Sequence, residues 1–317
     1  MEEYISRSSR SAPSLKDYQL CQPVGEGTFG KVWLARCRQN GASCAVKVVR
    51  RDIRKHESGD GGRVRREVDC LKRIDPFFPF ICQFYEDFEN DEYHFMVLQF
   101  HPGGTLRQLI HSMGALEEAP ARIYVAELTL ALDHLKRRSI VFRDLKTDNV
   151  LIDAAGHLKL TDFGLAKIIR QRTNSCTGSP HIMAPETLPP CESYDFKADW
   201  YSLGVCMYEM LCGAPPFSSV LDQIHVLFMR VTRDEIEFPE TFSPESCQVL
   251  QKLFRKNPHE RLASLEEMQR QKWFERLNWN KVLSQQYPGP YIARETAKLS
   301  LHSYPAGFTH FAALEYM

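Results

Sequence analysis

The chain has 317 residues, of which 43% are hydrophobic and 25% charged, ordinary proportions for a globular protein large enough for two lobes. Its 40 basic residues balance its 40 acidic residues, so net charge gives no reason to expect binding to nucleic acid or to a membrane surface. The 10 cysteines are scattered without a C-x-x-C pair or a zinc-like spacing, and no apolar run is long enough to span a bilayer.

The N-terminal part of the chain predicts a tail followed by strands. Residues 1–16 are rich in Ser and Arg and acidic at their start, which favours a flexible segment and not a secretory signal. From Tyr18 to Val48, short groups of Val, Ala and aromatic residues are divided by Gly-containing breaks, which is typical of an antiparallel sheet. The apolar spacing then predicts a helix over Arg63–Arg73, and Tyr93–Leu98 is expected to be a strand.

The pattern changes after the break at Pro102-Gly103-Gly104. A long helix is expected over Pro120–Arg138, with short strands and turns over Ile140–Leu160. Lys197–Cys212 is apolar on nearly all sides and predicts a buried helix. Helical patterns continue to Phe274.

We therefore predict an α+β fold of two lobes. A small lobe with an antiparallel β-sheet covers residues 17–98, residues 99–104 form a hinge, and a larger, mainly helical lobe covers residues 105–274. Residues 275–317, with Pro, Gly and Tyr but little periodicity, predict an extended tail that wraps the folded body.

The first chemical motif is glycine-rich. Residues 25–32 read Gly-Glu-Gly-Thr-Phe-Gly-Lys-Val and fit G-x-G-x-x-G-x-V, in which glycines allow backbone N–H groups to approach phosphate oxygens. An isolated match would fit an ordinary hairpin turn equally well. A dinucleotide-binding fold would need a helix directly after the last glycine, whereas Lys31–Ala35 reads as a strand.

A lysine and a glutamate follow on the next two elements. Lys47 lies in Ala45-Val46-Lys47 on a predicted strand, and Glu67 lies on the helix after it. A lysine held by Glu67 could reach the α- and β-phosphates of a nucleotide. The alternative is that both residues are ordinary surface charges.

The most informative segment is Val141–Asn149. Asp144 can accept or orient a hydroxyl proton, Lys146 can neutralise a moving phosphoryl group, and Asn149 can ligate a metal. Asp162-Phe163-Gly164 adds a second carboxylate, and two such oxygen ligands suit Mg²⁺. The alternative, two polar turns between short strands, does not explain why both motifs and the upstream lysine occur in order. Ala184-Pro185-Glu186 closes the segment that begins at Asp162, and Arg261 is a candidate ion-pair partner for Glu186.

Taken in order, these motifs resemble those of eukaryotic protein kinases from about Asp17 to Phe274. The resemblance implies the transfer of the γ-phosphate of ATP, with Mg²⁺, to a protein hydroxyl. It implies the following roles: Gly25, Gly27 and Gly30 cover the phosphates; Lys47, paired with Glu67, holds the α- and β-phosphates; Asp144 is the catalytic base; Lys146 contacts the γ-phosphate; Asn149 and Asp162 hold Mg²⁺.

It also implies an adenine site and an apolar spine. Val32, Ala45 and Leu151 would enclose the adenine, Leu98 would be the gatekeeper beside it, and the backbone of Gln99 and His101 would hydrogen-bond its edge. Leu71, Phe84, Phe142 and Phe163 fall where kinases stack a spine, although ordinary core packing would also explain them.

Within the family, the chain is similar to serine/threonine kinases of the AGC group, which includes the cyclic-AMP-dependent and phospholipid-dependent kinases. Asp144-Leu145-Lys146 is typical of Ser/Thr specificity, and Ser179 lies where a hydroxyl contacts the catalytic Asp and Lys. Phe142-Arg143-Asp144 and Pro288–Ile292 resemble AGC segments. Phe308-Thr309-His310-Phe311 fits the short F-x-x-F docking motif, for which chance is an alternative.

The resemblance also suggests control and substrate preference. Arg143 and Lys167 would bind a phosphate on Ser175, placed there by an upstream activating kinase, with Thr173 and Thr177 as alternative sites and an unmodified hydroxyl as the simpler explanation. Asp148 and Glu209 match acidic positions that bind an arginine upstream of the acceptor. A third such position is Thr105, so we expect a basic but looser preference.

Three other functions are the alternatives to this one. A pseudokinase scaffold usually lacks Lys47, Asp144 or Asp162, and all are present; a small-molecule phosphotransferase usually lacks Ala-Pro-Glu; tyrosine specificity is disfavoured by Lys146. As partners we expect protein substrates with Ser or Thr acceptors and no nucleic acid. We also expect a monomer without a membrane span, located in the cytoplasm, with the nucleus as an alternative location.

Overall fold

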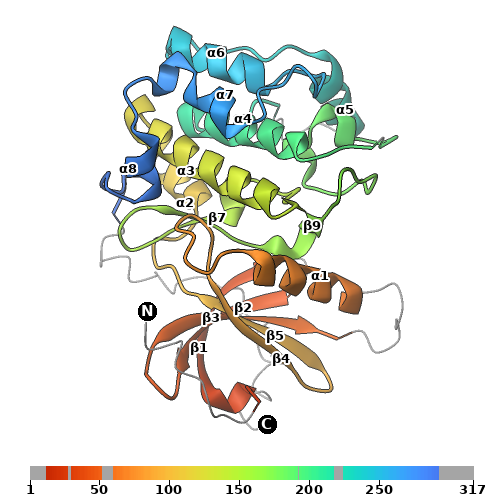
Figure 1. Cartoon of the computed structure of the whole chain (residues 1–317), viewed down its shortest axis with the longest axis vertical. Coiled ribbons are helices and arrows are strands. Elements are labelled where there is room, and N and C mark those ends of the chain that lie inside the picture. Colours follow the sequence, from red (N-terminus) through yellow and green to blue (C-terminus); the bar gives the residue numbers. More distant parts are fainter. Residues whose placement is uncertain (1–11, 28–29, 52–59, 192, 218–223, 293–317) are drawn as a thin grey trace.

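A five-stranded antiparallel sheet and one long helix form the small lobe of the computed structural model, which describes residues 12–27, 30–51, 60–191, 193–217 and 224–292 (Figure 1). The strand order is β1-β2-β3-β5-β4. The strands are β1 (Tyr18–Gly27), β2 (Gly30–Cys37), β3 (Ser43–Arg50), β4 (Phe84–Glu89) and β5 (Tyr93–Gln99), and the helix is α1 (Asp60–Arg73).

The alternation of side chains along β3 explains how α1 is held. Val46 and Val48 point into one apolar cluster of the sheet, whereas Val49 packs with Val64 and Val68 of α1 on the other face. Because side chains alternate along a strand, Lys47 shares the face of Val49 and points toward α1.

The helix α1 begins earlier than the sequence predicted. It starts at Asp60, three residues before the predicted start at Arg63, so Gly61 and Gly62 lie in its first turn. Glycine is tolerated there because the first N–H groups of a helix have no partner within the helix.

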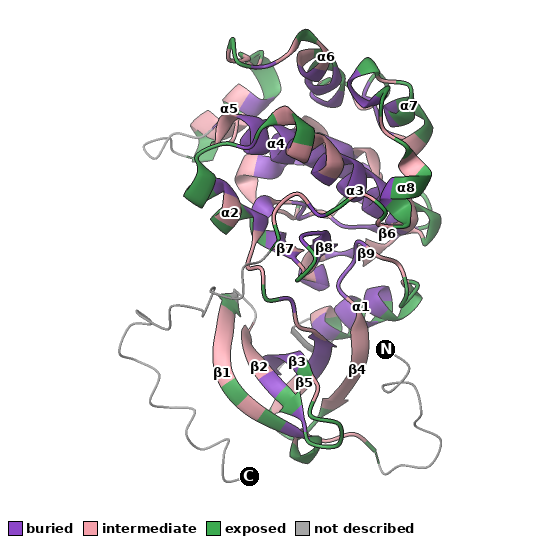
Figure 2. Ribbon diagram, turned by 90° about the vertical axis from the view of Figure 1, so that its left-hand side faces the viewer, coloured by how far each residue is buried: buried purple, intermediate pink, exposed green. Residues whose placement is uncertain are grey.

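The large lobe is built around two long helices. They are α3 (Glu118–Arg137), which begins two residues before Pro120, and α4 (Lys197–Cys212), where the structure matches the predicted bounds. All residues of α4 from Ala198 to Leu211 are buried, which agrees with its uniformly apolar sequence (Figure 2). The other helices are α2 (Leu106–Met113), α5 (Ile224–Arg233), α6 (Pro244–Leu253), α7 (Leu265–Gln269) and α8 (Trp279–Leu283).

Two pairs of short strands lie between the helices and the small lobe (Figure 2). They are β6 (Ile140–Val141) with β9 (Lys167–Ile168), and β7 (Val150–Ile152) with β8 (Leu158–Leu160). The chain that connects β6 to β7 and β8 to β9 carries the motifs singled out in the sequence.

The hinge is fixed to β7 by two backbone hydrogen bonds. Gly103 N–H donates to the Ile152 carbonyl, and Ile152 N–H donates to the Gly104 carbonyl, each over 3.0 Å. A Cβ on Gly103 would lie 2.5 Å from that Ile152 carbonyl oxygen, so only glycine fits this approach.

The two ends of the described chain carry more local structure than was expected of the tails. Leu15–Asp17 forms a 3-10 turn, and Leu15 packs partly buried against the sheet, although residues 1–16 were expected to be flexible. After residue 275 the chain includes α8, and Tyr291 lies 6.2 Å from Tyr124 of α3, ring to ring. Phe308 and Phe311 of the F-x-x-F motif lie outside the described residues.

Within the described ranges, no helix combines the length and the apolar character needed to cross a membrane.

Candidate active site

A buried lysine joins the two lobes. Lys47 Nζ on β3 lies 2.7 Å from Glu67 Oε1 of α1 and 2.7 Å from Asp162 Oδ1 of the large lobe. The predicted contact between Lys47 and Glu67 is therefore confirmed. Burial favours the neutral form of Lys47, but Glu67 and Asp162 outweigh it and raise the pKa of Lys47, so the ammonium stays charged.

Asp162 is held in a shape suited to this contact. Its φ is 60°, in the left-handed region, and its Oδ1 also accepts a hydrogen bond from Gly164 N–H at 3.4 Å. Burial would raise its pKa, but the Lys47 ammonium dominates and lowers the pKa of Asp162. Phe163, next in sequence, is buried and packs edge-to-face on Phe142 with ring centroids 5.1 Å apart.

Asp144 is the centre of a hydrogen-bonded group on the loop between β6 and β7. Asn149 Nδ2 donates to Asp144 Oδ2 over 2.8 Å, and Ser179 Oγ donates to Asp144 Oδ1 over 2.7 Å. Lys146 Nζ lies 3.1 Å from Asp144 Oδ2 and 2.8 Å from Ser179 Oγ. The contacts expected of Ser179 with the Asp and the Lys are confirmed.

One residue that supports this loop was missed in the sequence. Asp199 of α4 is buried, and its carboxylate accepts hydrogen bonds from the N–H groups of Phe142 at 2.8 Å and Arg143 at 2.7 Å. Arg143 has a φ of 70°, which is unusual for a residue with a side chain. The signal was a charged residue near the start of a helix that is otherwise largely apolar.

The predicted adenine-binding residues lie around the junction of the hinge with the sheet. Ala45 of β3 is paired with Leu98 of β5, and Val32 of β2 is paired with Lys47. Leu151 of β7 forms a bridge with Thr105 just after the hinge. Gln99 ends β5, and the His101 side chain is buried with its Nε2 atom unpartnered among the described residues. The structure thus brings these residues from four elements to one region.

The glycines of the first motif lie at the paired ends of β1 and β2. Gly25 is opposite Val32, and Gly27 is opposite Gly30. A Cβ on Gly30 would lie 2.3 Å from the Val48 carbonyl oxygen, so β2 could not pack against β3 with a larger residue there. Thr28 and Phe29 lie outside the described residues.

The two candidate metal ligands fit Mg²⁺ by their chemistry. The side-chain nitrogen of Asn149 donates to Asp144. No hydrogen bond within the described ranges uses the side-chain oxygen Oδ1 of Asn149 or Oδ2 of Asp162. The described residues contain no cluster of three or more His, Cys, Asp or Glu side chains that could hold a metal ion by themselves. Mg²⁺ commonly takes one or two protein oxygens and completes its shell with water and substrate phosphates.

The four residues of the predicted spine belong to connected parts of the core. Leu71, Phe142 and Phe163 are buried in the main apolar cluster, and Phe84 of β4 packs partly buried against it. Leu71 and Phe84 also line a common cavity of about 410 Å³ between the end of α1 and β4.

The segment after Asp162 brings basic groups to a serine. Arg143 Nη1 donates to Ser175 Oγ at 2.9 Å, and Lys167 Nζ donates to Thr173 Oγ1 at 2.9 Å. Tyr194 OH donates to the Ser175 carbonyl at 2.7 Å. Slight burial, together with the positive charges of Arg143 and Arg66, lowers the pKa of Lys167.

The predicted substrate-binding acids are not equivalent. Asp148 is exposed beside the Asp144 loop, whereas Glu209 of α4 is buried and already paired with Arg107 of α2 at 2.5 Å. Thr105, at the third position considered, accepts a hydrogen bond from Gln108 N–H and begins α2.

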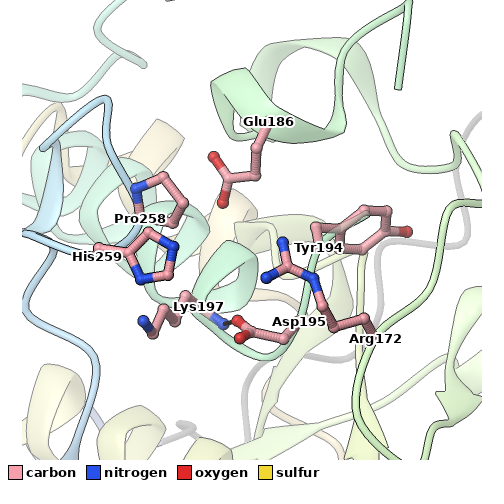
Figure 3. Close-up of a pocket in the computed structure, with 7 residues that line it drawn as sticks. All are labelled: Arg172, Glu186, Tyr194, Asp195, Lys197, Pro258 and His259. Carbon is pink, nitrogen blue, oxygen red and sulfur yellow. Dashed lines mark hydrogen bonds between the residues drawn. The ribbon is translucent and has the colours of Figure 1, made fainter. Parts of the chain in front are cut away.

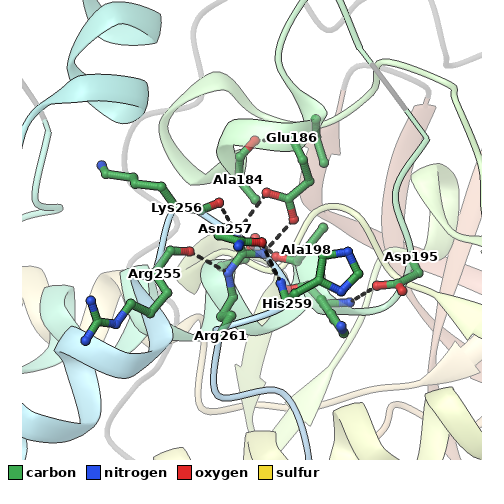
Figure 4. Close-up of polar contacts among 12 residues, drawn as sticks. Ala184, Glu186, Asp195, Ala198, Arg255, Lys256, Asn257, His259 and Arg261 are labelled. Carbon is green, nitrogen blue, oxygen red and sulfur yellow. Dashed lines mark hydrogen bonds and ion pairs between the residues drawn. The ribbon is translucent and has the colours of Figure 1, made fainter.

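The end of this segment is fixed to the helical lobe by a buried ion pair (Figure 4). Arg261 Nη1 and Nη2 lie 2.6 and 2.8 Å from the two carboxylate oxygens of Glu186, so the predicted pairing is confirmed. The guanidinium also donates to the carbonyls of Lys197, Arg255 and Lys256. Such a charge needs these partners because its side chain has no solvent exposure.

A small cavity lies next to this ion pair, between Arg172, Tyr194, Asp195 and His259 (Figure 3). Its volume is about 10 Å³, which is room for about one water molecule. It is therefore a packing feature and not a substrate site.

Comparison with known proteins agrees with this geometry. The family model "Protein kinase domain" matches residues 18–274. The serine/threonine-protein kinase AtPK2/AtPK19 of Arabidopsis thaliana is 37% identical over 274 residues, which cover 84% of this chain and 57% of that protein. The cAMP-dependent protein kinase type 3 of Saccharomyces cerevisiae is 32% identical over 291 residues, 90% of this chain and 71% of that protein.

A third relative is the human cGMP-dependent protein kinase 2, 32% identical over 312 residues, 96% of this chain and 40% of that protein. The chain thus spans little more than half the length of the Arabidopsis relative and less than half of the human one.

The chain belongs to the protein kinase family, whose members use ATP as the phosphoryl donor. The predicted family and the predicted fold of a β-sheet lobe with a helical lobe are confirmed.

Proposed function

We propose that this chain is a serine/threonine protein kinase that transfers the γ-phosphoryl group of Mg-ATP to protein hydroxyls. The observation that supports this most directly is the convergence of Lys47 and Asp162 at 2.7 Å, beside the loop that carries Asp144. The names of the relatives point to the same acceptor class.

Each side chain has a task that its contacts favour. The Lys47 ammonium, held by Glu67, would bind the α- and β-phosphates. Asn149 and Asp162 would hold Mg²⁺, which neutralises phosphate charge when bound. The substrate hydroxyl oxygen forms the new bond to the γ-phosphorus, the bond from that phosphorus to the bridging oxygen breaks, and ADP leaves.

Asp144 would take the hydroxyl proton, and Lys146 would offset the charge on the transferred group. Their positions support these roles, since Ser179 and Asn149 orient the Asp144 carboxylate from two sides. Positioning and charge neutralisation account for most of the catalysis in such reactions.

The test is transfer of radiolabelled phosphate from ATP to peptides that differ only in a Ser, Thr or Tyr acceptor. Asp144→Asn keeps the shape of the side chain and should lower kcat by at least about 100-fold, because general-base catalysis contributes that much or more. The exposed Asp91→Asn in the turn between β4 and β5 is the matched control and should be unaffected.

Wild-type turnover in Asp144→Asn would contradict the mechanism. Transfer to Tyr alone would contradict the acceptor class. Nucleotide binding without transfer would instead favour a pseudokinase scaffold.

We also propose that phosphorylation of Ser175 orders the segment that follows Asp162. Arg143 already contacts the Ser175 hydroxyl, and Lys167 contacts Thr173 two residues before it, so a phosphate on Ser175 would supply an anion beside these cations. Ser175→Ala should lower kcat/KM by about 10-fold or more once the wild type carries phosphate. Intact mass and peptide mapping check the modification, and equal activity with no phosphate at Ser175 would remove this proposal.

Finally, we propose a preference for basic residues before the acceptor, supported by the exposed Asp148 next to the Asp144 loop. A peptide array with acidic or proline-directed selectivity would contradict it.

A further inference from the structure

The Glu209 carboxylate, near the end of α4, has one partner within the chain on each of its oxygens. Arg107 Nη1 of α2 lies 2.5 Å from Oε1, and Thr147 Oγ1 donates to Oε2 over 2.9 Å. Thr147 directly follows Lys146, so this carboxylate lies one residue from the loop that would handle the acceptor. Glu209 is therefore at the active site, but it already has a cation.

The two partners differ in their exposure. The Glu209 side chain is only 5% exposed, whereas the Arg107 side chain is 48% exposed. A buried carboxylate strongly favours a cationic partner, and burial raises the pKa of Glu209 while Thr147 and Arg107 oppose that rise. The carboxylate is thus fixed in the core, and its cation comes from a side chain at the surface that can be displaced.

Among the described residues nearby, the other buried acid is Asp144, which already contacts Asn149, Ser179 and Lys146. His181 lies near Lys146, Asp148 and Arg107, and burial together with Lys146 lowers the pKa of His181, so its imidazole is neutral at physiological pH. Asp148 is exposed. A substrate guanidinium could use Asp148 in water, but it could reach Glu209 only by replacing Arg107.

We infer that Arg107 is a specificity-determining residue that occupies the place of a substrate arginine at Glu209. Peptides whose upstream arginine would bind Glu209 then gain little in kcat/KM over neutral peptides, because forming that ion pair requires breaking the pair of Arg107 with Glu209. This inference rests on the proposed function, and it makes the basic preference depend on Asp148 rather than on Glu209.

The test compares acceptor peptides that carry a single Arg at successive positions before the serine with a peptide that has Ala throughout. For the wild type, the ratio of kcat/KM values should stay below about 3-fold at the position whose arginine would reach Glu209. In Arg107→Ala, the ratio at one position should rise by at least about 10-fold, through a lower KM of the Arg peptide. The reason is that a charge-assisted hydrogen bond to the buried Glu209 carboxylate becomes available.

Matched variants separate this effect from general damage. Arg107→Lys keeps a cation on Glu209 and should behave like the wild type. Arg107→Gln should gain arginine selectivity while keeping a hydrogen bond to Glu209, in case the Ala variant folds poorly. Arg107→Ala with Glu209→Gln should lose the gain, and Arg137→Ala, an exposed arginine on α3, should change nothing.

Binding of the same fluorescent peptides, measured by anisotropy, distinguishes failure of the inference from failure of the proposed function. Stronger binding of the Arg peptide to Arg107→Ala without any transfer would contradict the proposed function alone. Equal selectivity in wild type and Arg107→Ala, in both assays, would overturn the inference. So would a strong arginine preference of the wild type that Glu209→Gln abolishes.

Discussion

Asp199 shows how a buried carboxylate can position a catalytic one. It accepts the N–H groups of the two residues that precede Asp144, at 2.8 and 2.7 Å. These bonds offset the strain of Arg143, whose φ of 70° costs energy in a residue with a Cβ. The loop that carries Asp144 is therefore anchored to the most deeply buried helix of the large lobe.

The pH dependence of stability should report this group. Burial raises the pKa of Asp199 from 3.8 to about 6, so the folded protein binds a proton there more tightly than the unfolded chain does. The resulting stabilisation is complete below pH 3.8 and is lost as the pH rises through about 6. A shift of about 2 pKa units corresponds to roughly 3 kcal/mol.

Asp199→Asn removes this titration. The free energy of unfolding of the wild type minus that of the variant should therefore fall between about pH 4 and pH 6, as measured by denaturant titration at several pH values. A difference that is independent of pH would contradict the prediction. Glu267→Gln, a change of an acidic residue outside this loop, is a control for general effects of charge.

Among the elements, the segment from Asp162 to Glu186 is held at its end by Arg261. The ion pair is bidentate and buried, and the guanidinium also binds three carbonyls from the large lobe (Figure 4). It connects the end of the segment to the start of α4 and to the residues before α7.

Removal of Arg261 from its ion pair with Glu186 should strongly destabilise the protein. Arg261→Met leaves Glu186 and three carbonyls without their donor, so the free energy of unfolding should fall by about 3–5 kcal/mol. Arg137→Met, which breaks the exposed pair of Arg137 with Asp133, should cost less than about 1 kcal/mol. Chemical unfolding of both variants checks this, and similar losses in the two would show that burial does not set the energy of the pair.

Elements with a strong periodic or apolar pattern could be predicted, and short or irregular ones could not. The range Lys197–Cys212 followed from its apolar character on all sides. The start of α1 was missed because Gly61 and Gly62 suggest a loop, and the short helix α8 was missed because five residues carry little pattern. Its one local signal is Asn278, whose side chain accepts a hydrogen bond from Lys281 N–H.

The same division applies to the site. The motifs predicted the contacts of Lys47 with Glu67, Ser179 with Asp144, and Glu186 with Arg261, because each residue lies in a recognisable pattern. The contact of Arg107 with Glu209 had no such signal. It joins the surface of α2 to the interior of α4, and only the packing of the two helices brings these side chains together.

At the scale of the whole molecule, a charged contact and an apolar one connect the lobes. Lys47 of the small lobe binds Asp162 of the large lobe, and Glu67 of α1 binds the same ammonium. Next to this contact, Phe163 packs on Phe142, and Leu71 of α1 belongs to the same core. The relative position of the lobes and the geometry of the proposed nucleotide site therefore depend on the same few side chains (Figure 1).

Lys47→Met should separate nucleotide binding from folding. The small lobe keeps its sheet and its packing against α1, so the variant should unfold cooperatively, but it loses the cation proposed to hold the phosphates. A ligand at 100 times its Kd stabilises a protein by about 2.7 kcal/mol, and a 10-fold weaker Kd reduces this to about 1.4 kcal/mol. The rise in Tm caused by Mg-ATP should therefore be about half that of the wild type or less.

Two controls test whether this rise reports Mg-ATP at Lys47. Chelation of Mg²⁺ should reduce the rise in Tm of the wild type. Lys72→Met, which removes a largely exposed lysine of α1, should leave the rise unchanged. An undiminished rise in Lys47→Met would mean that the phosphates are held elsewhere and that the ammonium between the lobes is only structural.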